Sequence, residues 1–210
     1  MRNLIMKDFA LLRSGRLLWM GLIYTIFILV DRGESDGIFG SSTFFLVFVT
    51  YIFVNYLNSY DYMYHGDQFL NAFPVSRREV VESRYASVLL LSGGFFCLAY
   101  GLRAVLWTFG YPYANGIVSF PQLTIVILAV ALYYGFLLPL YFKFGYERLR
   151  WLNFIALITV SIVSSVMGVL MMSVPVFRSW WMPLTSAGVG ALIIFISMRA
   201  SIKNYKSRDF

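Results

Sequence analysis

Long runs of apolar residues alternate with short polar segments along the whole chain of 210 residues. A helix needs about 20 consecutive apolar residues to cross the hydrocarbon core of a bilayer, and most of these runs approach that length. The pattern therefore predicts an all-α, polytopic integral membrane protein that forms a single transmembrane domain over residues 1–210. Six spans are expected, at about residues 17–32, 41–58, 84–107, 121–142, 152–173 and 182–199.

Residues 1–16 carry too many charges to span a membrane, but they show helical periodicity. The apolar side chains fall on one face of a helix: Ile5, Phe9 and Leu12. The polar side chains fall on the opposite face: Asn3, Lys7 and Ser14. This pattern is typical of a helix that lies in the membrane interface, and we predict such an elbow helix here. The residues leave open the alternative that this segment is a cytosolic extension of the first span.

The longest polar interruption between the predicted spans covers residues 67–85. Ser76 and Glu79 stand three apart just before an apolar run, which is the signature of a capping box at a helix start. Pro74 disfavours helical geometry at Phe73, so any earlier helix should end there. A helix that starts at Ser76 and continues through the third span has about 32 residues and a length of roughly 48 Å. We therefore expect it to project out of the bilayer.

The composition agrees with a membrane protein. Hydrophobic residues make up 60% of the chain and charged residues 13%, whereas a soluble domain carries about 25% charged residues. Six spans leave no room for a sizeable soluble domain. The single cysteine, Cys97, lies inside an apolar run. An intramolecular disulfide is therefore excluded, and we expect this side chain to pack within its span.

The distribution of basic residues predicts the orientation. If both termini are cytoplasmic, all but three of the 17 basic residues fall in cytoplasmic segments. Arg32 and Arg178 fall on the other side, and Arg103 falls near the outer end of the third span. This asymmetry follows the positive-inside rule. The net charge of +7 is then explained by orientation and by contact with anionic membrane lipid, and no nucleic-acid partner is expected.

The residues that catalytic and metal sites require are scarce. The one histidine, His65, lies in a polar segment away from Cys97, and a zinc site needs several such ligands. All ten acidic residues fall outside the predicted apolar cores, so no intramembrane proton relay is expected. The chain also lacks the Gly-x-x-x-x-Gly-Lys-Ser/Thr phosphate loop. We predict no catalytic, cofactor-binding or metal-binding residues, and no enzymatic activity, in this chain.

If the chain takes part in active transport, a separate ATPase must supply the work and needs a cytosolic docking surface. The largest candidate is the polar stretch from residue 67 to residue 84, with residues 143–150 as a lesser second. The residues alone leave two interpretations equally open. Phe69, Leu70 and Phe73 either contact an ATPase or lie on the lipid headgroups.

Two segments resemble a known family of membrane proteins. The opening Met1-Arg-Asn-Leu-Ile-Met-Lys-Asp-Phe-Ala-Leu-Leu12 resembles that of the ABC-2-type transporter permeases of Gram-positive bacteria. A second segment is similar to their cytosolic loop between spans two and three. It consists of Asp67, then Phe73-Pro-Val-Ser-Arg77 and Val80-Val-Glu-Ser-Arg-Tyr85. The chain resembles most the small six-span permeases that export phenol-soluble modulins, which are amphipathic helical peptides.

This resemblance implies a half-transporter in the bacterial cell membrane. Each permease would pair with a second copy or a sister permease, and would dock an ABC ATPase subunit that binds ATP and Mg. The resemblance assigns the contact to a coupling helix in the second loop, with these residues: Asp67, Phe69, Leu70, Phe73, Pro74, Ser76 and Arg77. The loop around Val174–Met182 is shorter than in lipid-exporting relatives. This departure favours a lipid-facing route for amphipathic or antimicrobial peptides.

Two other functions stay open at this point. The chain could be a non-transporting accessory membrane protein, or an ATP-independent channel. Small residues that recur four apart predict close helix packing, either within one subunit or between two. These pairs are Ser161/Ser165, Ser164/Gly168 and Ser186/Gly190.

Overall fold

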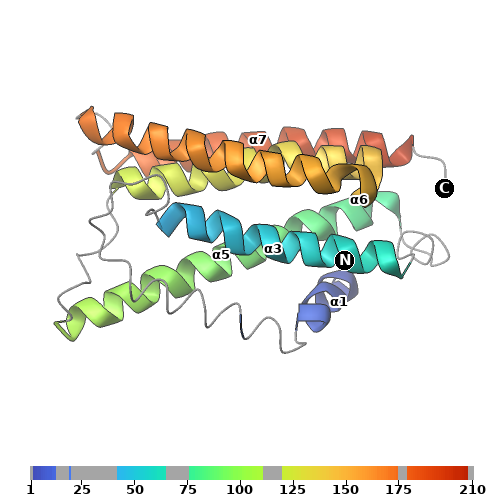
Figure 1. The fold of residues 1–210 in the computed structure, drawn as a ribbon, viewed down its shortest axis with the longest axis horizontal. Coiled ribbons are helices and arrows are strands. Elements are labelled where there is room, and N and C mark those ends of the chain that lie inside the picture. The colour runs from blue at the N-terminus through green and yellow to red at the C-terminus, as the bar shows by residue number, and fades with distance from the viewer. Residues whose placement is uncertain are drawn as a thin grey trace.

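The computed structural model describes residues 2–12, 19, 42–64, 76–110, 120–174 and 179–207. Every regular element in these ranges is a helix, in agreement with the predicted all-α class (Figure 1). The first predicted span, residues 17–32, lies outside the described residues apart from Trp19. The six-span topology therefore stays a prediction.

The described helices include one in the predicted elbow segment and others that overlap the remaining predicted spans. They are α1 (Arg2–Leu12), α3 (Ser42–Met63), α5 (Arg77–Thr108), α6 (Phe120–Ser173) and α7 (Met182–Lys206). Two helical stretches of the described chain are long and apolar enough to cross a membrane: Leu123–Val160 and Met182–Lys206.

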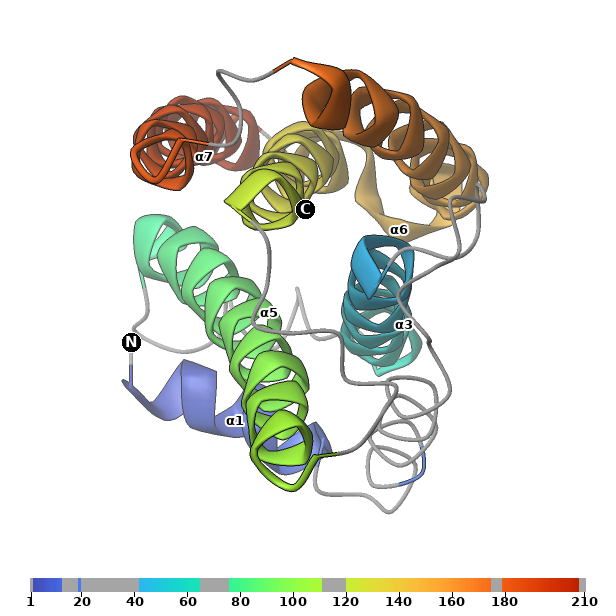
Figure 2. The same ribbon diagram turned by 90° about the vertical axis from the view of Figure 1, so that its left-hand side faces the viewer.

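A glycine divides α6 into two arms. Gly145 has φ 76° and ψ 175°, a conformation that glycine adopts without the steric cost that a side chain would add. The chain reverses here, so the first arm lies between α7 and the second arm (Figure 2). The expected boundary between the fourth and fifth spans, residues 143–151, contains this break. The apolar stretch Leu123–Val160 therefore consists of parts of two antiparallel helical segments and is not one long span.

The first arm of α6 forms the centre of the core. Tyr133, Tyr134, Leu137 and Leu138 are all at most 1% exposed. They belong to one apolar cluster with side chains of α3, α5 and α7, among them Tyr205. The helices α3, α5 and α7 thus depend on this arm for burial of their apolar faces.

Small residues let α7 approach this arm closely. Ser186 and Gly190 are both buried, and a Cβ on Gly190 would lie 3.2 Å from the Cβ of Ala131. A Cβ on Gly135 would lie only 2.6 Å from Cγ2 of Ile193. The predicted pair Ser186/Gly190 therefore packs within the chain. The side chains of Ser161, Ser164, Ser165 and the residue Gly168 are outside what the structure describes.

We expect Gly135→Ala to destabilise the protein by about 1–3 kcal/mol, the usual cost of overpacking. The added methyl overlaps Cγ2 of Ile193, and this β-branched side chain has little freedom at χ1 to move away. Thermal unfolding in detergent measures the effect. The matched control is Gly93→Ala on α5, where a Cβ meets nothing within 4 Å and helix propensity should raise stability. Equal midpoints for the two variants would contradict the close α6–α7 contact, as would failure of Ile193→Ala to rescue Gly135→Ala.

Candidate functional site

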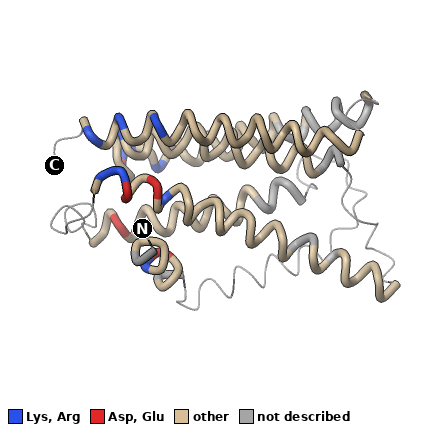
Figure 3. Tube along the Cα trace, turned by 180° about the vertical axis from the view of Figure 1, so that it is seen from behind, with Lys and Arg blue, Asp and Glu red and all other residues tan. Residues whose placement is uncertain are grey.

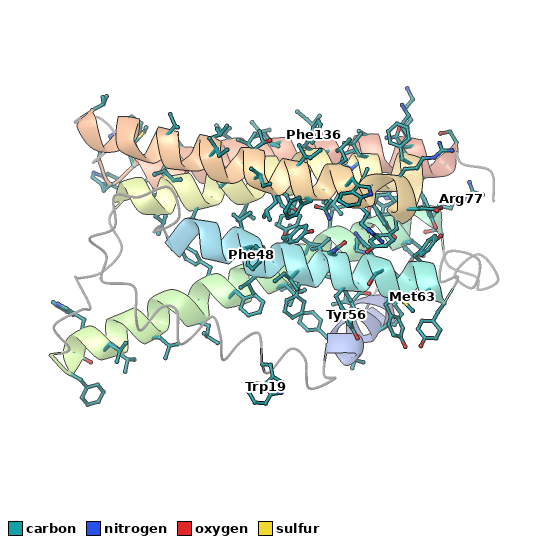
Figure 4. The ribbon with its side chains drawn as sticks, in the orientation of Figure 1. Trp19, Phe48, Tyr56, Met63, Arg77 and Phe136 are labelled. Atoms are coloured by element: carbon teal, nitrogen blue, oxygen red, sulfur yellow. The ribbon has the colours of Figure 1, made fainter. Side chains whose placement is uncertain are left out.

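Charged residues gather at one end of the helices (Figure 3). We call this region the charged end: α1, the end of α3 from Asp61, residues 76–84, the α6 turn at 143–150, and residues 199–207. Arg77 and Met63 lie there together in the side-chain view (Figure 4). Segments that the basic residues predict to be on one side of a membrane thus share one end of the bundle. Which side that is stays a prediction.

The start of α5 is built as its sequence predicts. The Glu79 backbone N–H donates to Ser76 Oγ at 3.2 Å, and the Ser76 backbone N–H donates to Glu79 Oε2 at 3.0 Å. The capping box is therefore complete, and α5 runs for 32 residues from Arg77. The hydrogen bond from the Ser76 backbone lowers the pKa of Glu79. Both the predicted helix start and the predicted helix length are confirmed.

Arg77 connects this helix start to the end of α7. Its Nη1 donates to the carbonyl oxygens of Lys206 at 2.9 Å and Tyr205 at 3.3 Å. The last carbonyls of a helix lack intrahelical donors and carry the negative end of the helix dipole, so a guanidinium suits both needs. The described Arg77 contacts are thus with α7. The role of Arg77 toward an ATPase stays a prediction.

A buried ion network joins α1, α3 and α5. Arg84 of α5 is ion-paired with Asp61 of α3, and its Nη1 lies 3.5 Å from Asp8 Oδ1 of α1. Lys7 of α1 donates to Asp61 Oδ1 at 3.0 Å. Asp8, Asp61 and Arg84 are only 4%, 7% and 7% exposed. Two acids face two bases, so the network is close to neutral.

The network is costly to form and more costly to break. Burial removes hydration from each ion, and only close opposite charges compensate for that loss. Burial alone raises the pKa of Asp61, but the adjacent Arg84 and Lys7 outweigh it and hold the pKa below its ordinary value. Asp61 therefore stays ionised and binds α1 and α5 to the end of α3.

A second polar contact holds α5 to α7 one residue after Arg84. The Tyr85 hydroxyl lies 2.6 Å from Ser197 Oγ and 2.8 Å from Ser201 Oγ, and all three side chains are buried. Together with Arg77, this contact fixes α5 against α7, while Arg84 fixes it against α1 and α3. The first two turns of α5 are consequently in contact with three other helices.

The predicted site residues divide into those described and those not. Ser76 and Arg77 are placed as above, whereas five predicted coupling residues lie outside the described part of the chain: Asp67, Phe69, Leu70, Phe73 and Pro74. In α1, Ile5 is half-buried and Phe9 is 40% exposed, and the side chain of Leu12 is not described. Lys7, on the opposite face, turns into the protein. The interfacial role of α1 stays a prediction.

Sequence reasoning missed the ion network. Asp61 and Arg84 are 23 residues apart, and Asp8 is on a different predicted helix. The available signal was weak: charges of opposite sign stand close to the ends of predicted spans. No group of three or more His, Cys, Asp or Glu side chains that could hold a metal ion occurs among the residues that the structure describes.

Comparison with known protein families gives one match. The family described as ABC-2 family transporter protein matches residues 3–206, which is nearly the whole chain. Comparisons with curated proteins and with solved structures find no match.

We expect Asp61→Asn to lower the free energy of unfolding by about 3–5 kcal/mol, because it leaves the buried Arg84 with too little compensating charge. Glu147→Gln, an equal chemical change at an exposed site of the charged end, should have little effect. Thermal unfolding of both variants tests this. Equal stability of Asp61→Asn and Glu147→Gln would show that the network contributes nothing.

The contribution of Asp61 should also depend on pH. A carboxylate with a lowered pKa in the folded state stabilises the fold above its unfolded pKa of about 3.9. That contribution is lost as the pH falls through the lowered folded value. The stability difference between wild type and Asp61→Asn should therefore be largest near pH 7 and shrink below about pH 4. A difference that is constant from pH 7 to pH 3 would rule out this linkage.

Proposed function

This chain belongs to the ABC-2 family of transporter membrane proteins, and we propose that it is the permease half of an ATP-driven exporter of amphipathic or antimicrobial peptides. Membrane permeases of this family are generally not catalytic themselves. ABC permeases generally pair with ATPase subunits, and the chain lacks a phosphate loop of its own. ATP and Mg then belong to the partner ATPase.

The observation that carries the proposal is the set of hydrogen bonds and ion pairs that connect α5 to neighbouring helices at the charged end. Residues 65–75 join Tyr64 to Ser76, and both of these residues stand at the charged end. A force that the ATPase applies to this loop acts directly on the first turn of α5. Arg84 passes the displacement to α1 and α3, and Arg77 and Tyr85 pass it to α7. The displacement then passes along α5, a stiff helix of 32 residues, across the membrane.

The exposed charges at this end suit a soluble partner. Basic side chains of the α6 turn and of α7 are exposed there: Lys143, Arg148, Arg150, Arg199, Lys203 and Lys206. An acidic surface on an ATPase would be complementary to those of the α6 turn and to Lys206. In this proposal the charged end is cytoplasmic, as the positive-inside rule predicts, and both termini are cytoplasmic.

The proposed substrate class rests on apolar surface between the arms of α6. A groove of about 690 Å³ lies there. Leu132 and Phe136 of the first arm and Ile155 of the second are among its lining residues, and all three side chains are exposed. The apolar face of a peptide helix can bury itself against such a wall. A second permease copy or a sister permease would complete the route.

The alternatives make different predictions. A non-transporting accessory protein has no ATPase partner. An ATP-independent channel conducts without nucleotide, and a conduction pathway usually carries charged rings or carbonyl filters. The described apolar grooves have neither feature, so the exporter is favoured.

Replacing Phe69, Leu70 and Phe73 by Asp should abolish co-purification of the partner ABC ATPase, because the loop would lose its apolar contact. The matched control is Phe109→Asp, which puts the same charge on an exposed aromatic at the opposite end of α5. Pull-down from membranes measures docking, and peptide-stimulated ATP hydrolysis in proteoliposomes measures coupling. Asp61→Asn should retain docking but reduce stimulation.

Undiminished docking and export by the triple variant would remove the coupling role from this loop. Export that persists without nucleotide would contradict ATP-driven transport altogether. If docking and coupling hold while no amphipathic peptide stimulates hydrolysis, the permease assignment stands and the peptide substrate class is wrong.

A further inference from the structure

A second apolar groove lies between α5, the first arm of α6, and α7. Its volume is about 610 Å³. Each helix contributes to its wall, with Phe96 from α5, Ile127 from α6 and Ile194 from α7. Small residues create the space, because a Cβ on Gly93 would meet nothing within 4 Å. No described side chain fills this groove.

The groove has the depth of one bilayer leaflet. Its wall on α7 extends from Ala187 to Met198, which is about 16 Å at the rise of an α-helix. The hydrocarbon core of a bilayer is about 30 Å thick, so a single leaflet is about half of that. Toward the charged end, the Tyr85 contact with Ser197 and Ser201 closes the space between α5 and α7. A ligand therefore enters from the side, out of the leaflet.

Basic side chains stand where this groove reaches the charged end. The Arg199 guanidinium lies 5.1 Å from the ring centroid of Phe195, which lines the groove. Lys203 is one turn further along α7 and is also exposed. On α5, Arg78 and Glu82 lie near the same level, but they form an ion pair at 2.6 Å and neutralise each other. Among the residues that the structure describes, the charge that remains at this edge of the groove is therefore positive.

From this combination we propose that the groove binds one acyl chain of an anionic phospholipid, with the headgroup phosphate at Arg199 and Lys203. The apolar wall takes the chain, and the two cations select the charge of the headgroup. This is a binding site on the permease that is separate from the route between the α6 arms. The bound lipid contacts both α5 and α7 beyond the Tyr85 contact, so it stabilises the pair.

A peptide helix fits this groove less well than an acyl chain. The open side of the groove faces hydrocarbon, so an amphipathic helix seated in it would turn its polar face toward lipid. The groove offers little polar compensation, because the Ser92 hydroxyl on its wall already donates to the Val88 carbonyl at 2.9 Å. An acyl chain needs no polar partner in the groove.

The test uses the full chain, purified in neutral detergent, with phosphatidylglycerol and phosphatidylcholine of identical acyl chains as probes. Native mass spectrometry measures lipid retention, and thermal unfolding measures stabilisation. We expect phosphatidylglycerol to be retained and to raise the unfolding midpoint, while phosphatidylcholine does so much less. Arg199→Gln and Lys203→Gln should each weaken phosphatidylglycerol retention about fivefold. Lys143→Gln and Arg150→Gln, exposed cations on the α6 turn, are the matched controls and should leave retention unchanged.

A second pair of variants tests the acyl chain. Gly93→Leu and Ala191→Leu project side chains into the groove and should abolish the stabilisation by phosphatidylglycerol without lowering the midpoint in detergent alone. Because the charge variants are exposed, they stay informative even if a filled groove impairs folding. Equal stabilisation by both lipids, or unchanged retention in the Arg199 and Lys203 variants, would overturn the proposal.

Two further measurements separate the alternative ligands. Inorganic phosphate that stabilises as well as phosphatidylglycerol would show a free-phosphate site and no acyl chain. An amphipathic peptide that displaces phosphatidylglycerol competitively would assign the groove to a peptide instead of a lipid. Both results would overturn the lipid proposal without affecting the ATPase pull-down, so the two proposals fail independently.

Discussion

The ion network around Arg84 is the interaction on which the arrangement of the charged end depends. A buried guanidinium is tolerable only with carboxylates beside it, and here Asp61 and Asp8 come from two different helices. α1, α3 and the start of α5 therefore cannot separate without exposing or isolating a charge. The network lies beside the Tyr85 contact with α7, so four helices meet within two turns of α5.

Away from the charged end, the helices are held by a different kind of interaction. Small residues allow α7 to approach the first arm of α6, and the apolar core is centred on Tyr133, Tyr134 and Leu137. Polar contacts are few here, one being the hydrogen bond that the Tyr133 hydroxyl donates to Asn153 between the arms of α6, and two apolar grooves lie between the helices. A polar, strongly connected end and an apolar, open middle are complementary properties in a transporter. The first receives force, and the second contacts lipid-soluble molecules.

This division suits a permease that does not itself hydrolyse ATP. The chain belongs to a transporter family and carries no phosphate loop, so energy has to arrive through contacts. The proposed entry point is the loop that precedes Ser76, and the polar contacts of α5 are the proposed path. The two grooves lie on different faces of the first arm of α6, which keeps the proposed lipid site separate from the proposed peptide route.

Local rules determined much of this protein from its sequence. The capping box at Ser76 and Glu79 set the start of α5, and the charged interruption near Gly145 separated the two arms of α6. Both follow from neighbouring residues and from apolar periodicity. The partners of Arg77 and Arg84 were decided only by tertiary structure. Arg77 contacts Lys206 of α7, 129 positions away in the sequence. The residues around a charge at the end of a span do not determine which distant carboxylate or carbonyl it will contact.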